Sequence, residues 1–523
     1  MRALQPPSKT FAFVLFLLVW ALVALSTGRL HVRGDASQMC NAAASIYDHG
    51  WIDVMHGRDD LHTGPDGLRY TKYPLGNTLQ CGPGLALQSL GSRIGGDESA
   101  TKYLLAGIVP ALWTALIALG FFSLGRELGF SRANAGWAAL FLVFCSPVWS
   151  YGREMYSEST QCMAVIWTVW AYVRAARLGT RRHYLLGGML VGLCIHCKTP
   201  LAVIGLATMV FMFMKRPNRQ HTLRFLTYGA IGFAPFFAAW LWYNQVRYGS
   251  MIEMGYSSGR DLSLGFETPM ASGLHGLLFS PGKSIFVYGP LLLLLPFGLN
   301  RMWRRHKALL VYAAIPTVFM LLTMAKWWSG LGDWGWGPRL VMPIYPLLFI
   351  GVLYVMEREG WQWRTAVISL AALGFVVNFL GIIIDHSHYI AVAGVTHAGM
   401  QIFRLQNWVR DDLVVVHFVP EFTPPVGHAW LLERYLSGEE WTDTSWYPWR
   451  TIGIPGWRPI PDPTPRTLNH WSDGSTMAWT IIGVGYSVCA LLFGGLLYGM
   501  RRRPRAQEPP TPRTRVAPPP PGV

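Results

Sequence analysis

Long apolar runs recur along almost the whole chain and constrain its fold more than any other feature. A membrane-crossing helix needs about 20 mostly apolar residues, and fewer where neighbouring helices shield it. The runs lie at roughly residues 10–28, 103–122, 134–150, 159–175, 184–197, 200–214, 225–245, 284–300, 308–325, 340–356, 365–385 and 477–500. Only 14% of the residues are charged, against about 25% in soluble proteins. The sequence therefore predicts an all-α polytopic membrane protein with about 12 transmembrane helices and interfacial helices in its outer loops.

The formal charge of +16 is unevenly distributed between the loops. Basic residues gather in both termini and in alternate short loops, whereas most acidic residues fall in the remaining loops. This asymmetry is typical of the positive-inside rule, so it predicts cytoplasmic N- and C-termini. Membrane topology then explains the net positive charge, which no longer supports a nucleic-acid partner.

The loops divide the chain into four parts. Residues 1–385 are expected to form a catalytic transmembrane module that includes a first outer loop at 29–102. A large outer loop at 386–476 and a last span at 477–500 follow. The proline-rich tail, 501–523, is expected to be a disordered cytoplasmic end. The first run has a basic flank like a signal peptide, but its length favours an uncleaved anchor.

Asp35 and Lys72 are the charged residues of the first outer loop with the most specific surroundings. Asp35 precedes a helical pattern, where it either caps the helix together with Gln38 or accepts a proton from an incoming hydroxyl. Lys72 lies between Tyr70 and Tyr73 in YTKYPLG. An interfacial lysine can contact a lipid phosphate, although simple snorkelling is the alternative.

Glu158 sits at the mouth of a predicted span, in YGREMYSEST. A carboxylate at that position is costly unless it faces a cavity or a partner. It is therefore a candidate site residue, and an ion pair with Arg153 is the structural alternative.

The segment AKWWSGLGDWGWGPRL carries tryptophans interleaved with glycines and ends near Arg339. One or two tryptophans would fit an interfacial aromatic belt. Four suggest a shaped surface that stacks on sugar or prenyl groups, and Arg339 can pair with a phosphate. The predicted lining residues are Tyr70, Trp327, Trp328, Trp334 and Trp336.

Cysteine and histidine patterns give no firm metal or redox site. Cys40 and Cys81 share one polar segment and can pair if that side is oxidising. The Cys194–Cys197 spacing lacks a second pair, and packing is the better interpretation. Histidines at 386 and 388 show no regular ligand spacing, so the sequence gives no certain cofactor.

Several motifs, in this order, resemble the GT-C superfamily of integral membrane glycosyltransferases. The likeness is to its bacterial polyprenyl-phosphate-dependent branch, which includes protein mannosyltransferases and aminoarabinose transferases. It covers roughly residues 10–390. The motifs are GDASQMCNAAASIYDHG, YTKYPLG, YGREMYSES, YNQVRYGSMIEMGY, GLLFSPGKSIFVYGP and KWWSGLGDWGWGPRLVMPIYPLL.

The resemblance implies an inverting transfer of a sugar from a polyprenyl phosphate to an extracytoplasmic acceptor, which would be a glycan, lipid or protein. It implies that Asp35 is the base, Glu158 the second acidic residue, and Lys72 and Arg339 the phosphate contacts. It also implies the bacterial inner membrane. Many relatives carry an acidic pair where this chain has Asp35 followed by Ala36. A divalent cation therefore stays an open alternative.

Two other classes of function compete with the glycosyltransferase hypothesis. A flippase for lipid-linked glycans would carry ionisable residues at mid-span and often an internal repeat. The chain has no convincing repeat, and its acids cluster near the predicted outer interface. A non-catalytic membrane scaffold is the third class. The sequence favours chemistry at the membrane surface.

Overall fold

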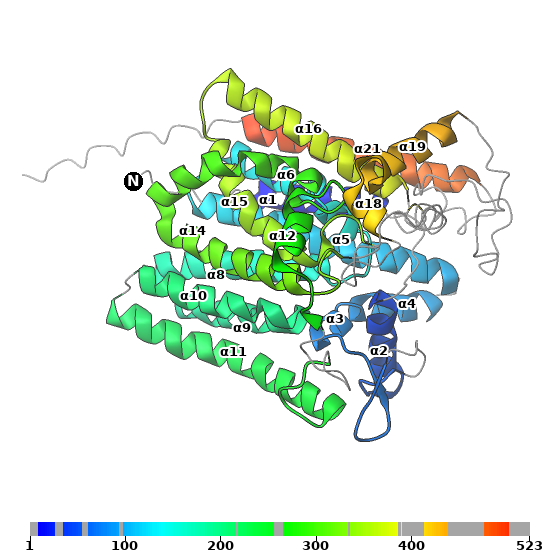
Figure 1. Cartoon of the computed structure of the whole chain (residues 1–523), viewed down its shortest axis with the longest axis vertical. Coiled ribbons are helices and arrows are strands. Elements are labelled where there is room, and N and C mark those ends of the chain that lie inside the picture. Colours follow the sequence, from blue (N-terminus) through cyan, green and yellow to red (C-terminus); the bar gives the residue numbers. More distant parts are fainter. Residues whose placement is uncertain are drawn as a thin grey trace, which may run out of the picture.

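The protein is a bundle of long helices that lie side by side, with shorter helices gathered at one end (Figure 1). The computed structural model describes residues 9–26, 35–54, 61–93, 98–215, 218–255, 265–332, 335–384, 389, 413–437 and 475–501. The tail beyond residue 501, most of the loop at 386–476 and the histidines at 386 and 388 lie outside these ranges.

The helices that build the bundle are mostly apolar and pack through small and aromatic side chains. They are α1 (Lys9–Leu25), α5 (Glu98–Glu127), α6 (Arg132–Phe144), α8 (Glu158–Leu178), α9 (Arg181–Cys197), α10 (Val203–Met214), α11 (Arg219–Tyr248), α14 (Leu295–Lys326), α15 (Tyr345–Val355), α16 (Trp361–Ile383) and α21 (Ser475–Arg501).

The remaining elements are short and lie mainly where chain segments turn at the ends of the bundle. They are α2 (Asp35–His49), α3 (Leu75–Leu79), α4 (Gly82–Arg93), α7 (Val148–Tyr151), α12 (Met270–Phe279), α13 (Ile285–Tyr288), α18 (Val414–Phe418), α19 (Pro424–Leu436) and the 3-10 helices η1 (Thr199–Ala202), η3 (Pro290–Leu294), η4 (Arg339–Ile344) and η5 (Pro420–Phe422). Two antiparallel strands, β1 (His62–Thr63) and β2 (Arg69–Tyr70), pair with His62 opposite Tyr70.

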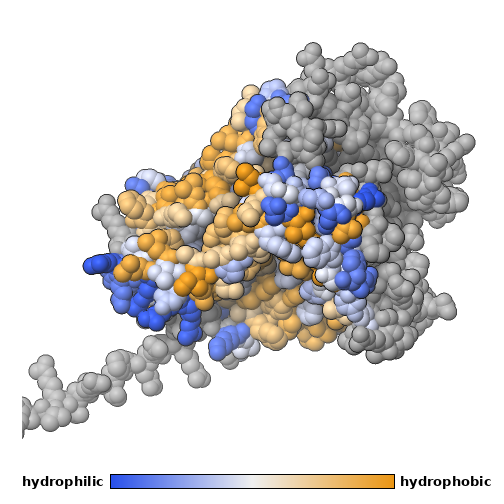
Figure 2. Space-filling model, turned by 90° about the horizontal axis from the view of Figure 1, so that it is seen from below, coloured by the Kyte–Doolittle hydropathy of each residue, from blue (hydrophilic) through white to orange (hydrophobic). Residues whose placement is uncertain are grey.

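Five helical stretches of the described chain are long and apolar enough to cross a membrane: Ile108–Glu127, Arg219–Tyr248, Pro290–Lys326, Trp361–Ile383 and Gly483–Arg501. Shorter apolar helices lie beside them. Figure 2 shows an apolar band between two more hydrophilic ends. The chain is thus a mostly helical integral membrane protein, as expected, and the count of twelve spans stays a prediction.

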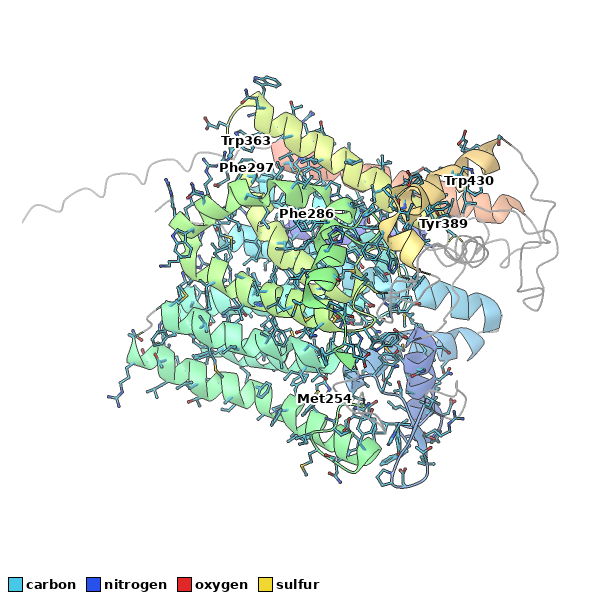
Figure 3. The ribbon with its side chains drawn as sticks, in the orientation of Figure 1. Met254, Phe286, Phe297, Trp363, Tyr389 and Trp430 are labelled. Atoms are coloured by element: carbon cyan, nitrogen blue, oxygen red, sulfur yellow. The ribbon has the colours of Figure 1, made fainter. Side chains whose placement is uncertain are left out.

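Aromatic side chains mark both ends of the bundle. Phe297 and Trp363 lie together at one end, with ring centroids 5.1 Å apart, and Tyr389 and Trp430 lie toward the other end (Figure 3). Aromatic rings favour the two interfaces of a membrane.

Between the predicted spans at 284–300 and 308–325, the structure has a kink where we expected a basic loop. The stretch α14 consists of two helices that meet at His306, whose backbone is non-helical. The intervening residues, NRMWRRHKA, include no proline or glycine that would end a helix. Arg301, Arg304 and Arg305 therefore project from helical backbone.

Candidate active site

Asp35 is the first residue of α2, and its carboxylate contacts an arginine from the far half of the chain. Oδ2 of Asp35 lies 2.6 Å from Nη2 of Arg339 in η4. Burial alone would raise the pKa of Asp35, but Arg339, a hydrogen bond from Tyr73 and the nearby charge of Lys72 together lower this pKa below its usual value. The carboxylate is therefore ionised at neutral pH.

Glu158, the first residue of α8, approaches the same guanidinium from another direction. Its side chain is buried, and Oε1 lies 3.8 Å from Nε of Arg339. Oε2 is buried and has no hydrogen-bond partner within the described part of the chain. Arg339 thus faces both acids that the sequence singled out. Arg153 instead donates to the carbonyl of Ile382.

Two side chains that the sequence analysis had not assigned to the site complete this cluster. The Tyr156 ring centroid lies 5.2 Å from the Arg339 guanidinium. Lys198, in the turn between α9 and η1, donates from Nζ to the carbonyl of Leu340 at 3.0 Å. Burial lowers the pKa of Lys198 to about 8, although the charges of Glu158 and Asp35 oppose this shift. A lysine between two apolar runs is costly without a partner, and that signal was available in the sequence.

The turn that carries Lys72 is held in place by Arg247, a buried residue near the end of α11. Nη1 of Arg247 donates to the carbonyls of Thr71 and Tyr73 at 2.8 and 3.2 Å. Its guanidinium also lies 3.8 Å from the ring centroid of Tyr243. Since a planar guanidinium fixes several acceptors at once, Arg247 determines the position of the Lys72 backbone beside Asp35.

The glycine-rich loop before Arg339 packs so closely that it has little room for side chains. A Cβ on Gly335 would lie 2.6 Å from both Cδ of Arg339 and the hydroxyl of Tyr151. Lys283 is fully buried and donates from Nζ to the carbonyls of Gly335 and Gly337, at 2.7 and 3.3 Å. The loop therefore acts as a rigid support for Arg339.

The predicted aromatic lining residues are spread over different surroundings. Trp336 is fully buried, with its ring against Tyr288 and His428. Trp328 is partly exposed, and the neighbouring Trp327 packs on Phe266. Trp334 lies outside the described residues.

Tyr70 is also fully buried, and its hydroxyl is engaged away from Asp35. It donates to Oδ2 of Asp66 at 2.5 Å and accepts from Nε1 of Trp51 at 3.0 Å. Its role as a lining residue stays a prediction.

The described residues do not fit a metal centre. They include no group of three or more histidine, cysteine, aspartate or glutamate side chains that could hold a metal ion. Between Asp35 and Glu158, the Arg339 guanidinium already supplies positive charge. Cys40 and Cys81 lie together as free thiols, with sulfurs 2.7 Å apart.

Residues 84–243 of the chain match the model of the dolichyl-phosphate-mannose-protein mannosyltransferase family. This stretch includes Glu158 and Lys198 but not Asp35, Lys72 or Arg339. The curated proteins give no match. The Archaeoglobus fulgidus oligosaccharyltransferase, solved in complex with zinc and sulfate, aligns over 92% of this chain with 10% identity and a TM-score of 0.26. The chain covers 52% of that protein. The family match supports a membrane glycosyltransferase.

Proposed function

We propose that this protein is an inverting glycosyltransferase that moves a sugar from a polyprenyl-phosphate donor to an extracytoplasmic acceptor. The acceptor is a cell-envelope glycan, lipid or protein, and the membrane is the bacterial inner membrane. The observation that carries the proposal is the position of the Arg339 guanidinium between Asp35 and Glu158. The Lys72 turn supplies a second cation at the same place.

The proposed step is a single displacement at the anomeric carbon. The acceptor hydroxyl oxygen forms a bond to C1 of the sugar while the bond from C1 to the phosphate oxygen breaks. The hydroxyl proton passes to Asp35, and the electron pair leaves with the polyprenyl phosphate. Attack from the face opposite the phosphate inverts C1. Because phosphate is a good leaving group, the enzyme has mainly to orient the acceptor and to neutralise the negative charge of the departing polyprenyl phosphate.

Arg339 connects donor binding to activation of the base. In the structure its guanidinium pairs with Asp35 at 2.6 Å, which keeps the carboxylate ionised but makes it a weak proton acceptor. A donor phosphate competes for the same guanidinium, since arginine binds phosphate and carboxylate alike. When the Arg339 guanidinium moves from Asp35 toward the donor phosphate, the Asp35 carboxylate becomes free to accept the proton of the acceptor hydroxyl.

Glu158 supplies the second acidic group of the proposed site. Its buried Oε2 is an acceptor without a partner in the described residues, and a buried acceptor of this kind gains from a hydroxyl donor. We assign it to a sugar hydroxyl, while its Oε1 faces Arg339. The partly exposed Trp328 is the member of the tryptophan-rich loop best placed to contact the prenyl chain or the sugar.

The test is a transfer assay on the purified full-length protein in vesicles that contain polyprenyl-phosphate sugars. Acceptors come from a cell-envelope extract, and products are followed by mass spectrometry. We expect release of polyprenyl phosphate together with a product of inverted anomeric configuration, and loss of both in Asp35→Asn. Movement of intact donor between leaflets without cleavage of its sugar–phosphate bond would instead show a flippase.

A further inference from the structure

A long groove separates α16 from α1, α6 and α21, away from the candidate active site. Its volume is about 1880 Å3, whereas drug-sized ligands occupy pockets of about 300–1,000 Å3. Asp35, Lys72, Glu158 and Arg339 are not among its lining residues. The groove is therefore a separate feature of suitable size for a lipid.

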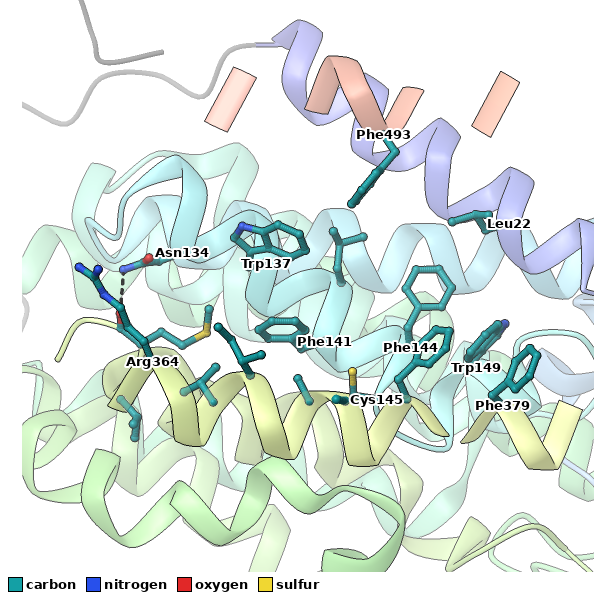
Figure 4. A pocket seen from close by; sticks show the side chains of 18 of the residues that line it. Leu22, Asn134, Trp137, Phe141, Phe144, Cys145, Trp149, Arg364, Phe379 and Phe493 are labelled. Carbon is teal, nitrogen blue, oxygen red and sulfur yellow. Dashed lines mark hydrogen bonds between the residues drawn. The ribbon is translucent and has the colours of Figure 1, made fainter. Parts of the chain in front are cut away.

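The walls of the groove are aromatic and aliphatic over most of its length. Trp137, Phe141 and Phe144 of α6 lie between α1 and α16, and Trp149 and Phe379 lie farther along (Figure 4). On α16 the lining residues extend from Trp363 to Ile383, and twenty helical residues extend about 30 Å. One leaflet of the hydrocarbon core is about 15 Å thick, so an acyl chain fits along these walls.

One end of the groove is basic and includes unpartnered donors. The charged residues that line this end are Arg301, Arg305, Glu357, Arg358, Glu359 and Arg364. Four arginines thus face two glutamates, and Glu357 already pairs with Arg305.

Two of these arginines hold buried nitrogens with no hydrogen-bond partner within the described chain, namely Nη1 of Arg301 and Nε of Arg358. The rest of Arg358 is fixed: Nη2 donates to the carbonyl of Phe297 at 3.1 Å, and its guanidinium lies 4.2 Å from the Trp363 ring centroid. Buried guanidinium donors are costly to leave unpaired, and a phosphate oxygen is a good acceptor for them.

We propose that this groove binds one anionic glycerophospholipid of the surrounding membrane. Its phosphate contacts Arg301, Arg358 and Arg364, and an acyl chain lies along Phe141, Phe144 and Phe379. The excess of arginine over glutamate selects an anionic headgroup over a zwitterionic one. This lipid-binding groove is separate from the proposed sugar-transfer site. The proposal that it binds a phospholipid does not depend on sugar transfer.

The test measures lipid retention by native mass spectrometry of the full-length protein extracted from vesicles of phosphatidylglycerol and phosphatidylcholine in equal amounts. We expect one phosphatidylglycerol to be retained at least about tenfold over phosphatidylcholine. Arg301→Gln combined with Arg364→Gln should remove this preference. Arg304→Gln, on the same helix but outside the groove, should keep it.

A second pair of variants tests the apolar walls without changing charge. Ala372→Trp places a large side chain into the groove and should abolish retention, whereas Leu373→Trp, on the exposed neighbouring position, should not. Equal retention of both lipids, unchanged retention in the double glutamine variant, or displacement of the phospholipid by added polyprenyl phosphate would overturn the proposal.

Discussion

Nη2 of Arg339 lies 2.6 Å from Oδ2 of Asp35, although 304 positions separate the two residues in the sequence. This contact joins the segment that follows α1 to the stretch that precedes α15. Glu158 and Lys198 approach from two other segments. The candidate site is therefore a junction of four parts of the bundle.

Asp35→Asn should lower the transfer rate by about 10²–10⁴-fold, because an amide cannot take the proton from the hydroxyl group of the acceptor substrate. The rate is measured with the purified protein and saturating donor. Asp48→Asn, at an exposed position of the same helix, is the matched control and should retain the wild-type rate. A fully active Asp35→Asn protein would exclude Asp35 as the base.

Arg339→Gln should move the acid limb of the pH–rate profile to higher pH. The wild-type pKa of Asp35 is held below its usual value against the effect of burial, so the wild-type rate should be lost only at a pH below the usual pKa of an aspartate. Without the guanidinium, burial raises the pKa of Asp35, and protonation then inactivates the base at a higher pH. Arg339→Lys retains the positive charge and should keep the limb near its original position. An identical acid limb in the glutamine variant would contradict this assignment.

Lys72→Ala should raise the KM for the donor by about 10- to 100-fold, as expected for loss of a charge-assisted contact to phosphate. The rate at saturating donor should change much less. Arg69→Ala, nearby on β2 and exposed, controls for a general loss of positive charge. The phosphate role of Lys72 is disproved by a donor dependence equal to that of wild type.

Gly335→Ala should lower the transfer rate by about 100-fold, because its Cβ would displace the Arg339 side chain and small displacements at a reacting centre are costly. Gly82→Ala is the comparison, since a Cβ there has nothing within 4 Å. Circular dichroism should show the same helix content in both variants. A Gly335→Ala enzyme as active as Gly82→Ala would mean that the loop does not hold Arg339.

Local sequence patterns predicted the helical bundle and the charged residues that meet in it. The sequence singled out Asp35, Glu158 and Arg339 because a charged side chain beside an apolar span is costly unless it has a partner. The structure brings these three side chains together. Other contacts depend on long-range packing that no local pattern encodes. Examples are the Lys283 bonds to Gly335 and Gly337 and the Arg247 bonds under the Lys72 turn.

Periodicity also cannot show how short the turn between two helices is or which face of a ring is covered. The basic stretch around His306 was expected to form a loop, but two helices meet there at a single non-helical residue. Trp336 looked like part of an open aromatic surface, but Tyr288 and His428 cover it. Both outcomes depend on neighbours that are remote in the sequence.

The bond between Asp35 and Arg339 also bears on when the protein becomes active during its synthesis. A chain emerging from the ribosome delivers its N-terminal segments first, so Asp35 reaches the membrane hundreds of residues before Arg339. Until η4 is inserted, the nascent protein has Asp35 but not the guanidinium that pairs with it. Under the proposed function, sugar transfer would therefore begin only late in translation, and partly inserted chains would not consume the lipid-linked donor.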